Sequence, residues 1–172
     1  MRFNDLHHKL AHQSYNLQQP KDYPFGTDMP PKLSLATRTV HASIGQVWGI
    51  VAAYGGECLW FPNVTKSTLE GFGVGSTRSL WFGNGPDGKE AWDDKAVREQ
   101  LVHADGAAYS LRWQIFNDNI GEVLSFSTLK LRAISDNTTE ITWSGETTFP
   151  DGPERDGLKV FIEAIERASL LM

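Results

Sequence analysis

The sequence predicts an α+β fold in which a curved, seven-stranded antiparallel sheet wraps around one long C-terminal helix. Two observations favour this architecture. The stretch 157–172 repeats apolar residues at helical spacing and places charged residues on the other side, which is typical of an amphipathic helix lying on a wall. Nearly all of the chain between Thr65 and Phe149 has the pattern of strands and turns, so it can supply that wall.

Length and charge narrow the class of protein. A chain of 172 residues fits one domain with room for an internal cavity, and we expect it to span 33–172. Residues 1–32 are expected to be an N-terminal extension or arm, because four prolines interrupt regular structure between positions 20 and 31. A net charge of -5, without a cluster of Lys and Arg, argues against nucleic acid as a partner.

Cysteine usage and hydropathy predict the compartment. The single cysteine excludes an internal disulfide, which favours a reducing compartment. No apolar run has the length of a membrane span or the form of a signal peptide. We therefore expect a cytoplasmic protein without a membrane span.

The domain is predicted to begin with a strand and two short helices. The strand covers 33–40, and Ser43 with Gln46 forms a capping-box pattern at the start of the first helix. Two consecutive glycines end this helix, and a second short helix over 57–61 stops at a proline. Cys58 in the second helix has no neighbouring histidine, so we expect a small buried side chain rather than a nucleophile.

Six further strands and the terminal helix complete the order. A glycine-rich run at 71–75 resembles a phosphate-binding loop, but it leads into a strand instead of a helix and therefore predicts a hairpin turn. The predicted strands are 65–70, 75–82, 97–104, 108–116, 123–134 and 139–149.

Several short motifs along this order resemble one known family. They are Val47-Trp48, Trp60-Phe61-Pro62-Asn63-Val64, Val74-Gly75-Ser76-Thr77-Arg78 and Val97-Arg98-Glu99-Gln100-Leu101. Together they resemble the START-like, Bet v 1-like (SRPBCC) superfamily, in particular its polyketide cyclase/dehydrase and lipid-transport branch, and more distantly the plant abscisic acid receptors. The resemblance covers about residues 33–172 and implies the helix-grip fold.

The resemblance also implies a cavity between the sheet and the terminal helix that holds an apolar or aromatic small molecule. The six Trp and nine Phe of the chain fit such a cavity. The alternation of side chains along each strand predicts which residues line the cavity, and it predicts that Lys130 and Arg132 are exposed to solvent. The predicted ligand-binding residues are Trp60, Leu80, Phe82, Leu101, Leu111, Trp113, Ile115, Ser125, Ser127, Trp143, Phe161, Ile165 and Ser169.

Two charged residues are predicted to face this cavity from adjacent strands. Arg78 and Glu99 would be unfavourable there unless they pair or meet a ligand. Glu99 could act as a general base and Arg78 could hold the resulting enolate, while Tyr109 or His103 returns the proton. The alternative is a salt bridge between Arg78 and Glu99 that only braces the sheet. His103, close to a strand end, could equally be a surface residue.

Two functions follow from these residues. In the first, the protein is a cyclase or dehydrase-like enzyme, a lyase or isomerase of secondary metabolism, that acts on a polyketide-like intermediate without a cofactor. In the second, it is a carrier or sensor of a hydrophobic ligand, as a monomer or a homodimer.

His8 and His12 stand four residues apart, but no third ligand follows, so no metal is expected. The long segment 83–95 is a predicted lid over the cavity, and a partner-binding role through this segment is a third candidate function.

Overall fold

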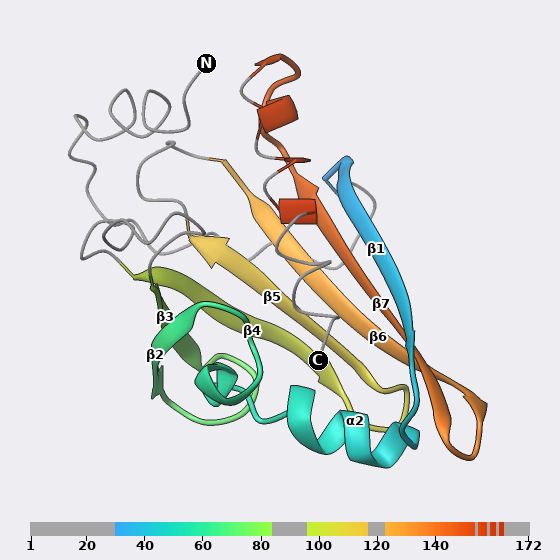
Figure 1. Cartoon of the computed structure of the whole chain (residues 1–172). Helices are drawn as coiled ribbons and strands as arrows, with labels where there is room; N and C mark the ends of the chain where they lie inside the picture. Colours follow the sequence, from blue (N-terminus) through green and yellow to red (C-terminus); the bar gives the residue numbers. More distant parts are fainter. Residues whose placement is uncertain are drawn as a thin grey trace.

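The computed structural model describes residues 30–83, 96–116, 123–153, 155–157, 159–160 and 162–163. These residues form an antiparallel sheet of seven strands with the order β1-β7-β6-β5-β4-β3-β2 (Figure 1). Two short helices lie between the first two strands. The elements are β1 (Lys32–Val40), α2 (Ile44–Val51), the 3₁₀ helix η1 (Glu57–Leu59), β2 (Val64–Glu70), β3 (Thr77–Phe82), β4 (Val97–Asp105), β5 (Ser110–Phe116), β6 (Ser125–Ser135) and β7 (Thr138–Thr147).

The observed sheet and the two observed short helices confirm the corresponding elements of the predicted fold. Each predicted strand boundary lies within two residues of the observed one. The run 71–75 is the predicted hairpin turn, because it joins the antiparallel strands β2 and β3. Its three glycines all have positive φ angles, which other residues adopt only with strain.

Helix α2 begins with the predicted capping box. The Ser43 hydroxyl accepts a hydrogen bond from the backbone N–H of Gln46, and the Gln46 side chain accepts one from the backbone N–H of Ser43. Val47 and Val51 are the buried side chains of this helix. They belong to the same buried cluster as Leu80 and other sheet residues, so α2 covers one face of the sheet.

The 3₁₀ helix η1 differs from its prediction in one respect. Cys58 is exposed, so the expectation that it is buried was wrong. Glu57 takes the inward position of this single turn instead and is completely buried. Leu59, which follows Cys58, is also exposed.

The long C-terminal helix is not confirmed. Residues 153, 155–157, 159–160 and 162–163 are helical, which agrees with the start of the predicted helix. Ile165 and Ser169 lie outside the described residues, as do the N-terminal extension up to residue 29 and most of the predicted lid (84–95). Within the part of the chain that the structure describes, no helix is long and apolar enough to cross a membrane.

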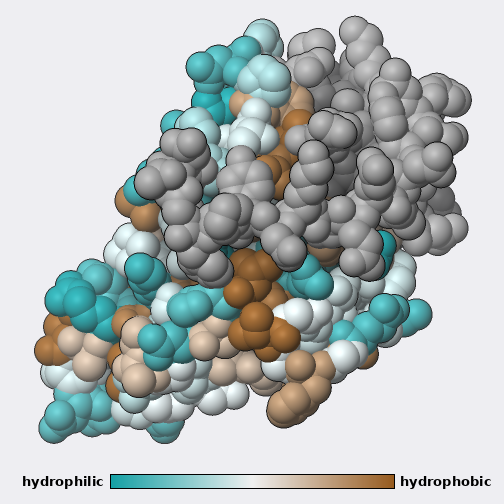
Figure 2. Space-filling view, turned by 180° about the vertical axis from the view of Figure 1, so that it is seen from behind, coloured by the Kyte–Doolittle hydropathy of each residue, from teal (hydrophilic) through white to brown (hydrophobic). Residues whose placement is uncertain are grey.

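The sheet has an inner face, against which α2 and η1 pack, and an outer face. On the inner face every second residue of β7 is buried, from Thr139 to Thr147. Lys130 and Arg132 are exposed, as predicted. The view from behind Figure 1 shows many hydrophilic side chains with a group of hydrophobic ones near the middle (Figure 2).

Candidate functional site

An aromatic cluster occupies the inner face of the sheet beside η1. It comprises Trp60, Phe61, Phe82, Trp113 and Trp143, whose neighbouring ring centroids lie 5.4 to 6.3 Å apart. Most pairs meet edge to face, which is a favourable arrangement of aromatic quadrupoles. The cluster therefore forms an apolar wall of tightly packed rings.

Two indole N–H groups in this cluster differ in their hydrogen bonding. The Trp143 Nε1–H donates to the Ser127 hydroxyl at 2.6 Å. The Trp60 Nε1 atom is buried and has no hydrogen-bond partner among the described residues. An unpaired buried donor is destabilising by about 1–3 kcal/mol, so a ligand oxygen would improve this position.

A cluster of buried charges adjoins the aromatic wall. Arg78 of β3 and Glu99 of β4 stand opposite each other in the strand register. Both Nε and Nη2 of Arg78 lie 2.5 Å from Oε2 of Glu99. The third partner is Glu57 of η1, whose Oε1 accepts from Arg78 Nη1 and, at 3.1 Å, from the backbone N–H of Gly55. One guanidinium thus joins two carboxylates.

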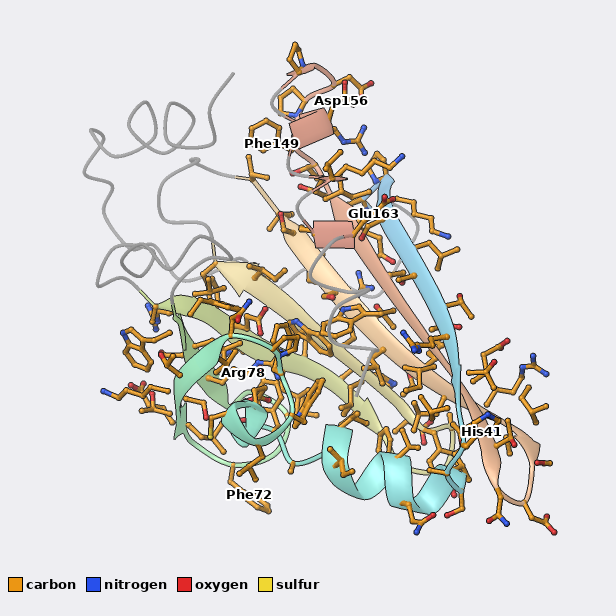
Figure 3. All side chains as sticks on the ribbon, in the orientation of Figure 1. His41, Phe72, Arg78, Phe149, Asp156 and Glu163 are labelled. Carbon is orange, nitrogen blue, oxygen red and sulfur yellow. The ribbon has the colours of Figure 1, made fainter. Side chains whose placement is uncertain are left out.

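The rings of two aromatic residues enclose this guanidinium. Arg78 Cζ lies 4.4 Å from the ring centroid of Tyr54 and 4.7 Å from that of Trp113. The Tyr54 hydroxyl donates to the backbone carbonyl of Glu99 at 2.9 Å, which ties the segment after α2 to β4. Arg78 lies on the side of the sheet that carries α2 and η1 (Figure 3). The charge cluster consists of Tyr54, Glu57, Arg78 and Glu99.

Burial dominates the electrostatics of the charge cluster. The exposed fraction of the residue is 0% for Glu57, 2% for Arg78 and 7% for Glu99. Burial raises the pKa of the Glu99 carboxyl; Arg78 and a hydrogen bond from Trp113 partly offset the rise, and the charge of Glu57 adds to it. Burial alone would lower the pKa of Arg78, but the two carboxylates raise it above its ordinary value. Burial also raises the pKa of Tyr54.

Most predicted ligand-binding residues do lie on the inner face. Those that the structure buries are Leu80, Leu101, Leu111, Trp113, Ser125, Ser127 and Trp143. Trp60, Phe82 and Ile115 are partly buried and pack against the same core. Phe161, Ile165 and Ser169 lie outside the described residues, so the cavity that they were expected to close remains a prediction.

Two of the four predicted catalytic residues are not near the charge cluster. The predicted inward orientation of His103 was wrong, because the register of β4 shifts between Leu101 and His103. His103 pairs with Arg112 and lines an open groove of about 460 Å³ on the outer face with Lys130 and other residues. The surface alternative for His103 therefore agrees with the structure.

Tyr109 lies at the opposite end of the sheet from Glu99. It packs edge-on against Trp48, with ring centroids 5.5 Å apart. Glu99 pairs with Ile115, six positions further along the chain than Tyr109, which corresponds to about 20 Å along a strand. Tyr109 therefore cannot return a proton to Glu99 directly.

Sequence reasoning missed Tyr54 and Glu57. Both lie in the connection between α2 and β2, where no strand alternation indicates which way a side chain points. The available signal was the single acidic residue between a Gly-Gly pair and an apolar stretch. No group of three or more metal-ligating side chains is placed to hold an ion within the described ranges.

The comparisons with known proteins agree with this fold. Residues 35–170 match the family described as "Polyketide cyclase / dehydrase and lipid transport". The chain therefore belongs to this family, within the SRPBCC superfamily. No curated protein matches the chain.

Three similar solved structures illustrate the fold. An uncharacterised protein from Bacillus thuringiensis is 23% identical with a TM-score of 0.59; the match covers 79% of this chain and 93% of that one. The ZhuI aromatase/cyclase from Streptomyces is 18% identical with a TM-score of 0.60, covering 79% and 87%. Norcoclaurine synthase from Thalictrum flavum, in complex with dopamine and hydroxybenzaldehyde, is 16% identical with a TM-score of 0.57, covering 79% and 82%.

Proposed function

We propose that the protein binds an apolar or aromatic small molecule against the aromatic cluster and catalyses a cofactor-independent cyclisation, dehydration or isomerisation of a polyketide-like intermediate. The observation that carries this proposal is the position of Trp113. Its ring stacks on the Arg78 guanidinium and also meets Trp143 of the aromatic wall at 5.7 Å. A ligand on that wall would therefore lie next to a buried acid–base group.

In this proposal Glu99 exchanges the proton. It has the most exposed side chain of the three charged residues, at 9% against 3% for Arg78 and 0% for Glu57. Its carboxylate would take a proton from an acidic C–H or a phenol, and Arg78 would offset the negative charge of the resulting enolate. A pKa above the ordinary range brings a carboxyl closer to neutral pH, where general acid–base catalysis is most efficient.

The family and its members support this class of chemistry. The family description names cyclases, dehydrases and lipid transport, and the similar Streptomyces structure is an aromatase/cyclase. Phe161, Ile165 and Ser169 would close the ligand cavity from the terminal helix, and the segment 83–95 would cover its entrance.

Binding is tested with 2-naphthol, a neutral aromatic probe, followed through tryptophan fluorescence. Trp60→Phe keeps an aromatic ring but removes the unpaired N–H donor of the wall. Loss of one hydrogen bond of about 0.5–1.5 kcal/mol should weaken binding roughly 2- to 10-fold. The matched control is Trp81→Phe, because Trp81 contacts Lys66 instead of the aromatic cluster. Equal affinity in all three proteins would mean that the probe binds elsewhere.

Catalysis is tested with benzoylacetone, which combines an aromatic ring with an acidic C–H between two carbonyl groups. The wild type should accelerate hydrogen–deuterium exchange at this carbon, measured by NMR. Glu99→Gln should slow the exchange by about 10²–10⁴, because it removes the base and keeps the shape. Failure of the wild type to accelerate the exchange would reject the enzyme proposal.

A carrier or sensor of a hydrophobic ligand is the second candidate. It is favoured by the saturation of Arg78, which already contacts two carboxylates and two rings without a ligand. In that case Glu57, Arg78 and Glu99 only brace the connection after α2 against β3 and β4. The carrier would bind 2-naphthol as expected and would leave the exchange rate of benzoylacetone unchanged.

A further inference from the structure

We propose that the cluster of Glu57, Arg78 and Glu99 holds one proton on Glu99, and that Glu57 is a positioning residue that keeps this proton ready for transfer. The inference extends the proposed function by assigning a role to Glu57. It concerns the free protein, so it can be tested without a substrate.

The first argument is the charge count. Two carboxylates and one guanidinium meet where Glu57 is 0% and Arg78 only 2% exposed. Fully ionised, the three groups carry a net negative charge that no other cation offsets among the described residues. Leaving an uncompensated charge in the interior is strongly unfavourable, and two carboxylates that share a site keep one proton for this reason.

The second argument is the set of groups that face the carboxylates. Among the described residues these are Tyr54 after α2, Glu57 on η1, Arg78 on β3, Glu99 on β4 and Trp113 on β5. Arg78 is the only cation of this set, and the Tyr54 hydroxyl donates to a backbone carbonyl. No member of this set can balance the charge of the second carboxylate, so a bound proton must do so.

The third argument is how the carboxylate oxygens are used. Glu57 Oε1 accepts two hydrogen bonds, while its Oε2 is buried and has no hydrogen-bond partner in the described part of the chain. Glu99 directs one oxygen at both Nε and Nη2 of Arg78. The Glu99 side chain is the more exposed of the two carboxylates, at 9% against 0% for Glu57, so Glu99 is the one that can exchange the proton.

Carboxyl ¹³C NMR of the ligand-free protein tests this proposal directly. In the wild type, the Glu99 side-chain carbon should report a proton that is released well above the ordinary glutamate pKa of about 4.3. Glu57→Gln leaves a balanced pair of Arg78 and Glu99, so the release at Glu99 should move down by at least about one pH unit. Glu140→Gln is the charge-matched control, because Glu140 pairs with the exposed Arg132.

Two outcomes would overturn the proposal. The first is a wild type in which the Glu99 carbon titrates near the ordinary value, which needs no variant and so holds even if Glu57→Gln does not fold. The second is a Glu99 titration that is the same in Glu57→Gln and in the wild type.

A kinetic measurement separates positioning from a merely structural role. If the wild type exchanges the benzoylacetone proton, Glu57→Gln should shift the pH profile of that exchange to lower pH by the same amount as the NMR titration. Glu99→Gln should instead remove the activity at all pH values. No exchange in the wild type rejects the proposed enzyme, while the NMR result decides independently whether Glu99 holds the proton.

Discussion

Replacing Arg78 with methionine is the most severe test of the charge cluster. The substitution keeps an apolar stem but leaves Glu57 and Glu99 without their common cation. Removing one partner of a buried ion pair typically destabilises a protein by about 3–5 kcal/mol. Two rings stack on the guanidinium, and each such contact contributes about 0.5–2 kcal/mol. We therefore expect a loss of at least about 4 kcal/mol at pH 7, a large part of a typical total of 5–15 kcal/mol.

The loss should depend on pH in a defined direction. Without Arg78, which partly offsets the effect of burial, the Glu99 carboxyl binds its proton still more tightly in the folded than in the unfolded protein, so the free energy of unfolding should rise as pH falls toward the ordinary pKa of about 4.3. Urea unfolding followed by tryptophan fluorescence at pH 7.5 and pH 5.5 measures both effects. Adding Glu57→Gln and Glu99→Gln to Arg78→Met should recover most of the stability, because no buried charge remains.

Arg132→Met is the control for this experiment. Its side chain is 66% exposed, and its salt bridge to Glu140 lies at the surface, so its removal should change stability by no more than about 1 kcal/mol. A loss below about 1 kcal/mol for Arg78→Met, or a loss that does not change with pH, would contradict the electrostatic reasoning.

Three further predictions concern other parts of the argument. The free energy of unfolding of the wild type should fall as pH rises through the raised pKa of Glu99, by up to about 1.4 kcal/mol per pH unit, and Glu99→Gln should lack this slope in urea titrations over the same range. Ser43→Ala should destabilise the protein by about 1 kcal/mol, because it removes the hydroxyl that accepts from Gln46; no change in the urea midpoint would show that the cap is dispensable. Gly83→Ala places a methyl group 2.5 Å from Thr65 Cγ2 and should cost about 1–3 kcal/mol, which Thr65→Ser should relieve in a double-mutant cycle; additive effects would contradict this contact.

The strand part of the fold follows from local sequence because its signal repeats every two residues. Leu111 and Trp113 were predicted to face inward by alternation, and both are buried. The same rule failed for His103, because one irregular position after Leu101 turns every later side chain of β4 to the other face. Nothing in the composition of β4 indicates this shift, since it depends on the pairing with β5.

Sequence analysis predicted two of the four residues of the charge cluster, Arg78 and Glu99, and missed the other two for a different physical reason. Arg78 and Glu99 lie on regular strands, so alternation placed them on one face, and the strand register brings them together. Glu57 and Tyr54 reach the cluster from an irregular connection, across 21 and 45 positions of sequence respectively. Their orientation is set by the turn around Gly55, which has a φ angle of 94°. Such tertiary contacts leave no periodic signal in the chain.

The second carboxylate is the feature that a purely structural explanation leaves unexplained. One carboxylate is enough to neutralise Arg78, and a buried ion pair adds little stability beyond what apolar residues of similar size provide. Glu57 adds desolvation and repulsion from Glu99, which are unfavourable unless the cluster holds a proton. If the cluster is a proton site maintained for chemistry, the charge-free combination of Glu57→Gln, Arg78→Met and Glu99→Gln should be about as stable as the wild type at pH 7 but should no longer exchange the proton of benzoylacetone. If the cluster is only a brace, the wild type itself should leave the exchange rate of benzoylacetone unchanged.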